Sequence, residues 1–265
     1  MSQFLLISGT FYGAWFWDKT IGALEKYGHQ GRAIDLSGQG QDQTPLKNVT
    51  LAAMVNTVVA ALTELPGPVV LIGHSMAGMV ISAAGDKAPE LIKMLVYVCT
   101  FLPRDGESLL SIERRNPKMI VPKSMTFDAD QTVGTLMSEK ARELFYHECT
   151  DADVASACAR PRPQALSAFE NPIHLTADRF GRISRVYVEC TEDHALAIEM
   201  QRDMIAKSPP ADVRSLPSSH SPFLSMPNEL AAVLFRTCES VGLRRRCGGN
   251  VPAYRVSLDI CTDCC

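Results

Sequence analysis

Residues 69–84 read VVLIGHSMAGMVISAA, and this stretch decides the fold. An apolar run leads into Ser75, which stands among small residues, and a second apolar run follows at once. A buried strand, a sharp turn and a helix in immediate succession are typical of the turn that lifts a nucleophilic serine above a parallel sheet. The stretch therefore predicts an α/β protein with Ser75 as its candidate nucleophile.

Small residues flank the serine because strand and helix pass close to it on either side. Gly73 stands two positions before Ser75. The usual pattern has a second glycine two positions after the serine, and this chain has Ala77 there with Gly78 following. The departure amounts to one methyl group. An ordinary turn with a helix-capping serine is the alternative, because serine is favoured at helix N-termini.

A nucleophilic serine needs a general base and an acid that orients the base. In α/β enzymes of this kind the acid and then the histidine follow the serine along the chain. His220 is favoured as the base because it lies between a strand-like stretch, 212–216, and a helix-like stretch, 229–238. Such a loop lies at the carboxyl edge of the sheet, where ligand sites gather. A surface or helix-capping histidine is the alternative.

The acid is expected just after the predicted strand 183–189, where Glu192 and Asp193 stand side by side. We prefer Asp193, but spacing does not decide which carboxylate faces the histidine, so Glu192 stays open. The preceding apolar run, 95–98, is followed by cysteine and threonine and offers no rival carboxylate. A solvated loop carboxylate is the alternative for Asp193.

A glycine-rich loop, 8–15, follows the first predicted strand, 4–7. An oxyanion hole in this fold takes one backbone N–H from that loop and one from the residue after the nucleophile. Thr10 and Met76 are therefore the candidate donors. The loop does not fit Gly-x-Gly-x-x-Gly or a phosphate-loop lysine pattern, so nucleotide binding is disfavoured. We expect no cofactor.

Several segments resemble one known family. They are residues 7–17 (ISGTFYGAWFW), 28–29 (GH), 33–36 (AIDL), 73–78 (GHSMAG), 180–181 (FG), 191–193 (TED) and 220–223 (HSPF). They resemble the plant methylesterase and hydroxynitrile lyase family of α/β-hydrolases, which has bacterial carboxylesterase relatives. The likeness spans roughly residues 4 to 238.

The resemblance implies that Ser75, Asp193 and His220 form a catalytic triad. It also implies that the backbone amides of Thr10 and Met76 form the oxyanion hole. The expected enzyme is a serine carboxylesterase that acts through an acyl-enzyme.

The family's lyases cleave cyanohydrins with the same triad and are the rival chemistry. They carry a lysine after the catalytic histidine and a threonine before the first oxyanion-hole residue, where this chain has Ser221 and Gly9. Because no cation stands there, ester hydrolysis is favoured. A lyase-type enzyme and a hydrolase-fold receptor with little turnover remain the alternatives. A second departure is Ser8, since the family usually has histidine before that glycine.

Short strands alternate with amphipathic helices over residues 1–101 and again over 179–240, which predicts a mostly parallel sheet with helices on both faces. Residues 102–178 lack comparable apolar strands and are predicted to be an inserted, mostly helical cap. Residues 241–265 show no periodicity and predict an irregular tail. The expected fold is therefore the α/β-hydrolase fold with a cap.

The predicted cap would cover the serine and shape the substrate site. Candidate substrate-binding residues are Gly9, Phe11, His74, Met125, Phe127 and Phe145. For any one of the apolar cap residues, simple packing of the cap onto the sheet is the alternative. The expected substrate is a small to medium hydrophobic ester of methyl, aromatic or pyrethroid-like type.

Composition excludes several other functions. A chain of 265 residues with 46% hydrophobic and 21% charged residues suits one globular enzyme, and its net charge of −3 argues against nucleic-acid binding. No stretch approaches the ~20 apolar residues of a membrane span. No signal peptide precedes the first strand, so we expect a cytoplasmic location. A homodimer is left open. The cysteines at 261–265 resemble half a zinc site without its partner pair, so no metal is expected.

Overall fold

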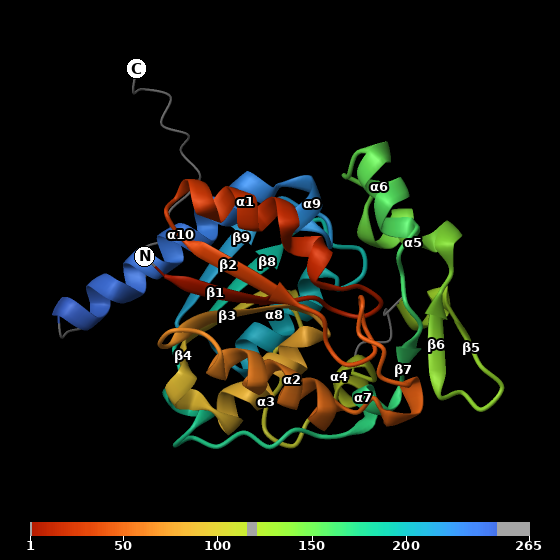
Figure 1. The fold of residues 1–265 in the computed structure, drawn as a ribbon, viewed down its shortest axis with the longest axis horizontal. Coiled ribbons are helices and arrows are strands. Elements are labelled where there is room, and N and C mark those ends of the chain that lie inside the picture. The colour runs from red at the N-terminus through yellow and green to blue at the C-terminus, as the bar shows by residue number, and fades with distance from the viewer. Residues whose placement is uncertain (1, 116–120, 248–265) are drawn as a thin grey trace.

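A six-stranded parallel sheet forms the centre of the molecule (Figure 1). The computed structural model describes residues 2–115 and 121–247, and only the helical backbone of 240–247. The strands are, in chain order, β1 (Gln3–Ile7), β2 (Gln30–Ile34), β3 (Val69–Ser75), β4 (Ile92–Thr100), β8 (Arg185–Cys190) and β9 (Asp212–Leu216). They lie in the order β2-β1-β3-β4-β8-β9, and every neighbouring pair is parallel. Strands β3 and β4 are buried almost throughout, as central strands of a parallel sheet must be.

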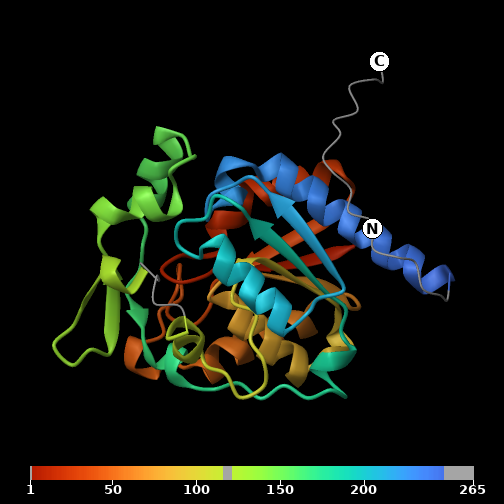
Figure 2. The same ribbon diagram turned by 180° about the vertical axis from the view of Figure 1, so that it is seen from behind.

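Helices cover both faces of the sheet (Figures 1 and 2). One face carries α1 (Asp18–Lys26), α9 (Pro222–Ser225) and α10 (Pro227–Cys247), and the other carries α2 (Leu51–Thr63), α3 (Ala77–Lys87) and α8 (Ile198–Lys207). Side chains alternate along a strand, so Leu5 and Ile7 join the core under α2 and α3. Phe4 and Leu6 join the core under α1 and α10. The predicted sheet with helices on both faces is confirmed.

A cap lies beyond the carboxyl ends of the strands (Figure 1). Its helices are α4 (Leu109–Glu113), α5 (Ser138–Phe145), α6 (Asp151–Cys158) and α7 (Ser167–Glu170). It also holds an antiparallel sheet of β5 (Met125–Phe127), β6 (Val133–Leu136) and β7 (Gln164–Ala165), which the sequence analysis missed. The strands have only two to four residues, too few for a period-two pattern to stand out. Short 3-10 helices are η1 (Ala14–Trp17), η2 (Leu46–Asn48), η3 (Pro89–Leu91), η4 (Val121–Ser124) and η5 (Phe180–Arg182).

Helix α10 is longer than expected. It runs from Pro227 to Cys247, whereas the sequence predicted an irregular chain from residue 241. That prediction is wrong for 241–247, and residues 248–265, including the cysteine cluster, lie outside the described residues. Within the described ranges, no helix is both long and apolar enough to cross a bilayer.

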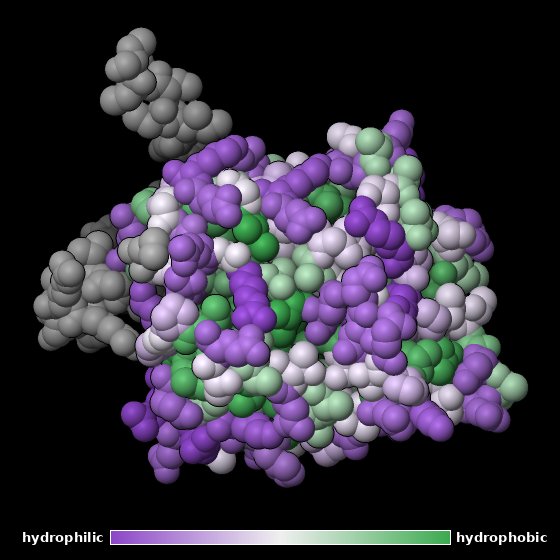
Figure 3. Space-filling model, in the orientation of Figure 1, coloured by the Kyte–Doolittle hydropathy of each residue, from purple (hydrophilic) through white to green (hydrophobic). Residues whose placement is uncertain are grey.

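The outer surface is mixed in character. On the face seen in Figure 3, polar side chains predominate and apolar ones lie in patches between them. Among the residues whose side chains are described, the large hydrophobic ones that are exposed are Tyr27 at the end of α1, Phe127 in the cap sheet and Val213 in β9. They are far apart in the sequence and belong to different elements.

The start of α3 packs tightly onto the end of β4. A Cβ atom at Gly78 would lie 1.9 Å from the carbonyl oxygen of Phe101 and 2.4 Å from Oγ1 of Thr100. Helical Gly22, in contrast, has nothing within 4 Å of its Cβ position. The same substitution should therefore have opposite effects at the two glycines.

We expect Gly78→Ala to lower the free energy of unfolding by about 2 kcal/mol or more, because the added methyl overlaps backbone that cannot move freely. Gly22→Ala should raise it by about 0.5–1 kcal/mol, because alanine is the better helix former. Urea unfolding of both variants and the parent protein measures the difference. A Gly78→Ala protein as stable as the parent would contradict the packing described here.

Candidate active site

Ser75 stands in a strained turn between β3 and α3. Its φ angle is +54°, in the left-handed region that residues other than glycine rarely adopt. Its carbonyl oxygen accepts hydrogen bonds from the backbone N–H of Phe101, at 3.1 Å, and from the hydroxyl of Thr100. These bonds from the end of β4 hold the strained conformation in place.

Glycines make room for this turn. A Cβ at Gly9 would lie 2.5 Å from the Cβ of Ser75, so the loop after β1 reaches the serine only because residue 9 has no side chain. A Cβ at Gly73 would lie 2.9 Å from Cδ1 of Ile81. After the serine, the position without room for a side chain is Gly78, whereas the methyl group of Ala77 fits in the core.

His220 and Asp193 form a buried pair. The Nδ1–H of His220 donates to Oδ2 of Asp193 over 2.7 Å, and the two residues are 3% and 5% exposed. Oδ1 of Asp193 accepts the backbone N–H groups of Ala195 and Leu196, each at 2.8 Å. With Nδ1 engaged as a donor, Nε2 of His220 is left as the acceptor, which is the form a general base requires.

The choice between the two adjacent carboxylates is therefore decided by geometry. Glu192 is exposed, and the hydrogen bond to its side chain comes from the hydroxyl of Thr191. Asp193, as preferred from the sequence, is the one that meets the histidine.

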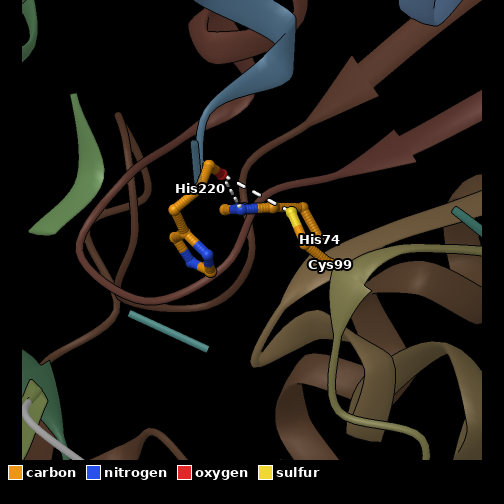
Figure 4. A group of neighbouring side chains, drawn as sticks. All are labelled: His74, Cys99 and His220. Carbon is orange, nitrogen blue, oxygen red and sulfur yellow. Dashed lines mark hydrogen bonds between the residues drawn. The ribbon is translucent and has the colours of Figure 1, made fainter. Parts of the chain in front are cut away.

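The backbone of His220 is held from behind by two side chains (Figure 4). Its carbonyl oxygen accepts the Nε2–H of His74 at 2.9 Å and the Sγ–H of Cys99 at 3.6 Å. The rings of His74 and His220 lie 4.5 Å apart. Burial, together with the neighbouring His220, lowers the pKa of His74 well below its usual value. His74 is therefore neutral, with its proton on Nε2.

These three residues also bring ligand atoms within 4.8 Å of one another, as a metal site would. Each has another partner: His74 and Cys99 hold the carbonyl of His220, and His220 itself holds Asp193. Burial also raises the pKa of Cys99, so it is a thiol rather than the thiolate that binds metal. A metal ion here would have to break these bonds, and we do not assign one.

The loop after β1 is fixed at both ends. The hydroxyl of Ser8 donates to the carbonyl oxygen of Gly13 at 2.6 Å, so the serine that departs from the family pattern closes the loop. Phe11 has a φ angle of +75°, and its carbonyl oxygen accepts the backbone N–H of Arg162 at 2.8 Å. The guanidinium of Arg162 donates to Gly40 at 3.0 Å, so one cap residue holds two core loops.

A small cavity of about 20 Å³ collects residues from five segments. Its walls are Thr10, Phe11, Tyr12, Phe16, His74, Ser75, Phe145, Tyr146, His220 and Ser221. Ser75 and His220 thus meet at one cavity, as predicted, and the cap contributes Phe145 and Tyr146. This enclosed volume is closer to that of a water molecule than to that of an ester.

The sequence-predicted residues that line this cavity are Ser75, His220, Thr10, Phe11, His74 and Phe145. Gly9 lies against Ser75, Met76 directly precedes α3, and Asp193 is bonded to His220, so these three adjoin the cavity without lining it. The prediction of Met125 and Phe127 is wrong for this cavity. Both belong to the cap strand β5, where Met125 lies over Gly134 and Phe127 is 44% exposed.

Sequence reasoning missed four wall residues: Tyr12, Phe16, Tyr146 and Ser221. Three of them adjoin residues that were singled out, since Tyr12 follows Phe11, Tyr146 follows Phe145 and Ser221 follows His220. Phe16 had a weaker signal, its place in the aromatic stretch 11–17.

A model of the alpha/beta hydrolase family matches residues 4–233. The chain belongs to the alpha/beta hydrolase family. Among similar proteins, "Putative methylesterase 14, chloroplastic" of Arabidopsis thaliana is 29% identical over 90% of this chain and 72% of that protein. "Methylesterase 18" of the same plant is 30% identical over 90% of this chain and 98% of that protein.

A solved structure supports the fold of this hydrolase. Polyneuridine aldehyde esterase has a TM-score of 0.81 and 24% identity, covering 90% of this chain and 99% of that one. The resemblance to plant methylesterases is confirmed, and so is the prediction of an ester-hydrolase enzyme.

His74 should give the stability of this hydrolase a characteristic pH dependence. Below about pH 6.5 the imidazole gains a proton in the unfolded chain but not in the folded one, because its folded pKa is lowered. The free energy of unfolding should then fall by up to about 1.4 kcal/mol per pH unit as the pH drops. His74→Gln should remove this part of the slope, since glutamine can donate to the same carbonyl without titrating.

Urea unfolding between pH 8 and pH 5 makes the comparison. The parent protein, measured at the same pH values, is the control. Identical slopes for the parent protein and His74→Gln would contradict a buried, neutral His74.

Proposed function

We propose that this alpha/beta hydrolase is a carboxylic ester hydrolase that works through an acyl-enzyme, with Ser75, His220 and Asp193 as its catalytic triad. One observation carries the proposal. A buried histidine–aspartate pair, joined over 2.7 Å, shares a cavity with a serine in a strained turn of φ +54°. Strain at the serine and burial of the pair do not by themselves stabilise the fold. Their combination supports nucleophilic catalysis.

The proposed mechanism has two halves. Oγ of Ser75 attacks the ester carbonyl while Nε2 of His220 takes its proton, and the buried charge of Asp193 stabilises the imidazolium that forms. When the tetrahedral intermediate collapses, the carbon–oxygen bond to the alcohol breaks and His220 gives the proton to the leaving alkoxide oxygen. Water then attacks the acyl-enzyme with the same proton transfers, which releases the acid and restores Ser75.

The oxyanion is proposed to bind the backbone amides of Thr10 and Met76. Thr10 lines the cavity, and the glycine before it lets the loop approach Ser75. Met76 directly precedes α3, an eleven-residue helix whose N-terminal amides favour a negative charge. Both supports are backbone features, so side-chain substitution at either position would be a weak test.

The proposed substrate is a small to medium hydrophobic ester. The cavity walls include Phe11, Phe16 and Phe145, which suit an apolar acyl or alcohol group. A relative of Vitis vinifera, 27% identical over 90% of this chain, bears the name "Methyl jasmonate esterase 1". A methyl ester of a ring-bearing acid is therefore a suitable first class to assay.

The lyase alternative has less support. The position after the histidine is Ser221, which lines the cavity, and none of the described wall residues is a lysine or arginine. A departing cyanide would find no cation there. The receptor alternative is separated from an esterase by turnover, since a receptor would give one turnover or none.

Ser75→Ala should lower ester turnover by at least about 10³-fold while the protein stays folded, because the nucleophile is lost and the methylene stays. Burst and steady-state kinetics with 4-nitrophenyl esters measure this, and cyanide release from mandelonitrile is followed in parallel. Ser82→Ala is the control: it removes a buried hydrogen bond to Tyr97 elsewhere on α3 and should keep turnover. Equal turnover in a folded Ser75→Ala protein, or cyanohydrin cleavage faster than ester cleavage, would refute the proposal.

Substitution of the two neighbouring carboxylates tests the acid. Asp193→Asn should reduce kcat by about 10³–10⁴-fold, because an amide no longer holds the histidine in its working tautomer. Glu192→Gln should change kcat less than twofold, since that side chain is exposed. Steady-state kinetics at one pH compares the pair, and the opposite ranking would assign the acid to Glu192.

A further inference from the structure

Two tyrosines line the cavity that holds Ser75 and His220. Tyr12, in the loop after β1, is 4% exposed, and Tyr146, which follows α5 of the cap, is 0% exposed. Their rings meet edge to face with centroids 6.1 Å apart. Neither hydroxyl has a hydrogen-bond partner of good geometry within the described part of the chain.

A buried hydroxyl without a partner is unfavourable, because it has lost its hydrogen bonds to water. Burial raises the pKa of Tyr12 and of Tyr146, so both stay protonated and both can donate. Two hydroxyls carry two hydrogens, and one hydroxyl can give at most one of them to the other. At least one O–H is therefore left for a third group.

The surroundings of the pair are otherwise apolar. The ring of Tyr12 lies 4.2 Å from that of Phe16, and Tyr146 lies against Phe145 and Phe16 at 5.9 Å and 6.4 Å between centroids. The printed side-chain bond of His220 goes to Asp193 and not to these hydroxyls. The two hydroxyls thus add polar groups to the part of the wall that is built from aromatic rings, and a few polar groups in a mostly apolar wall are typical of a site that orients a ligand.

We propose that Tyr12 and Tyr146 form a hydrogen-bonding subsite for an oxygen atom of the substrate other than those of the ester group. The proposal rests on the proposed ester hydrolysis and narrows its substrate class to esters with an ether, hydroxyl or carbonyl oxygen a few atoms from the scissile bond. A substrate oxygen that reaches these hydroxyls would supply their missing hydrogen-bond partner. A plain alkyl ester leaves the hydroxyls unpaired and loses that gain.

A merely structural role for the pair is the alternative, since Tyr12 belongs to the core and Tyr146 to the cap. The two roles differ in their consequences. Loss of a structural contact lowers stability and affects all esters alike. Loss of a subsite changes the ratio between esters that differ in a single oxygen.

Two matched pairs of esters test the subsite. In the acyl pair, 4-nitrophenyl 3-methoxypropanoate replaces one methylene of 4-nitrophenyl pentanoate by oxygen. In the alcohol pair, 2-methoxyethyl butanoate does the same for butyl butanoate. The ratio of kcat/KM within each pair is measured for the parent protein, Tyr12→Phe and Tyr146→Phe, so intrinsic reactivity cancels between proteins.

We expect at least one pair's ratio to fall by about three- to tenfold in a phenylalanine variant, because the methoxy ester loses a hydrogen bond that the alkyl ester never makes. Tyr97→Phe is the control: it removes a buried hydroxyl that bonds Ser82 and does not line the cavity, and it should leave both ratios unchanged. Unchanged ratios in both Tyr12→Phe and Tyr146→Phe, or equal losses for both members of each pair, would overturn the proposal.

Binding to Ser75→Ala separates this proposal from the proposed function. The unreactive ketones 4-methoxybutan-2-one and hexan-2-one repeat the acyl pair without an ester bond, and calorimetry gives their Kd ratio with and without Tyr12→Phe or Tyr146→Phe. If the parent protein hydrolyses no ester, the proposed function fails, and the ketone ratio alone decides the subsite. A preference for the methoxy ketone that a phenylalanine variant removes supports the subsite, and no preference refutes it.

Discussion

The site depends on a close approach between three pieces of backbone at Ser75. The serine has a left-handed conformation, which β4 holds through Phe101 and Thr100. Gly9 on one side and Gly78 on the other lack the side chains that would separate these pieces. Strands β1 and β4 lie on either side of β3 in the sheet. They therefore bring the residues that enclose the turn to Ser75. The central strands of the fold and the position of Ser75 are thus fixed together.

Local features of this arrangement could be predicted from the sequence, because they rest on short-range sterics. The apolar run at 69–72 and the small residues at 73–78 foretold strand, turn and helix. The carboxylate and histidine followed from strand ends. The structure was needed to show that Asp193 and not Glu192 contacts the histidine. Packing, rather than spacing in the sequence, sets which way a loop side chain points. Met125 and Phe127 do not line the described cavity, and the sequence could not show this, since hydropathy alone does not tell which face of a cap strand points inward.

Contacts between the cap and the core could not be predicted. Tyr12 and Tyr146 are 134 residues apart and meet only because the cap folds back over the loop after β1. Arg162 reaches Phe11 and Gly40 in the same way. These cap contacts set the shape of the cavity, and they come from irregular chain that has no periodic pattern. The walls of the cavity thus include segments where sequence patterns carry the least information.

The two hydrogen bonds to the carbonyl oxygen of His220 fix the orientation of this residue when the chain folds. His74 and Cys99 hold the backbone, and Asp193 holds the ring, so the imidazole has little rotational freedom before any ligand arrives. Aligning the ring costs side-chain entropy. That entropy is lost once, when the chain folds, and not again at each catalytic cycle. Under the proposed mechanism, both proton transfers would meet a base that is already oriented.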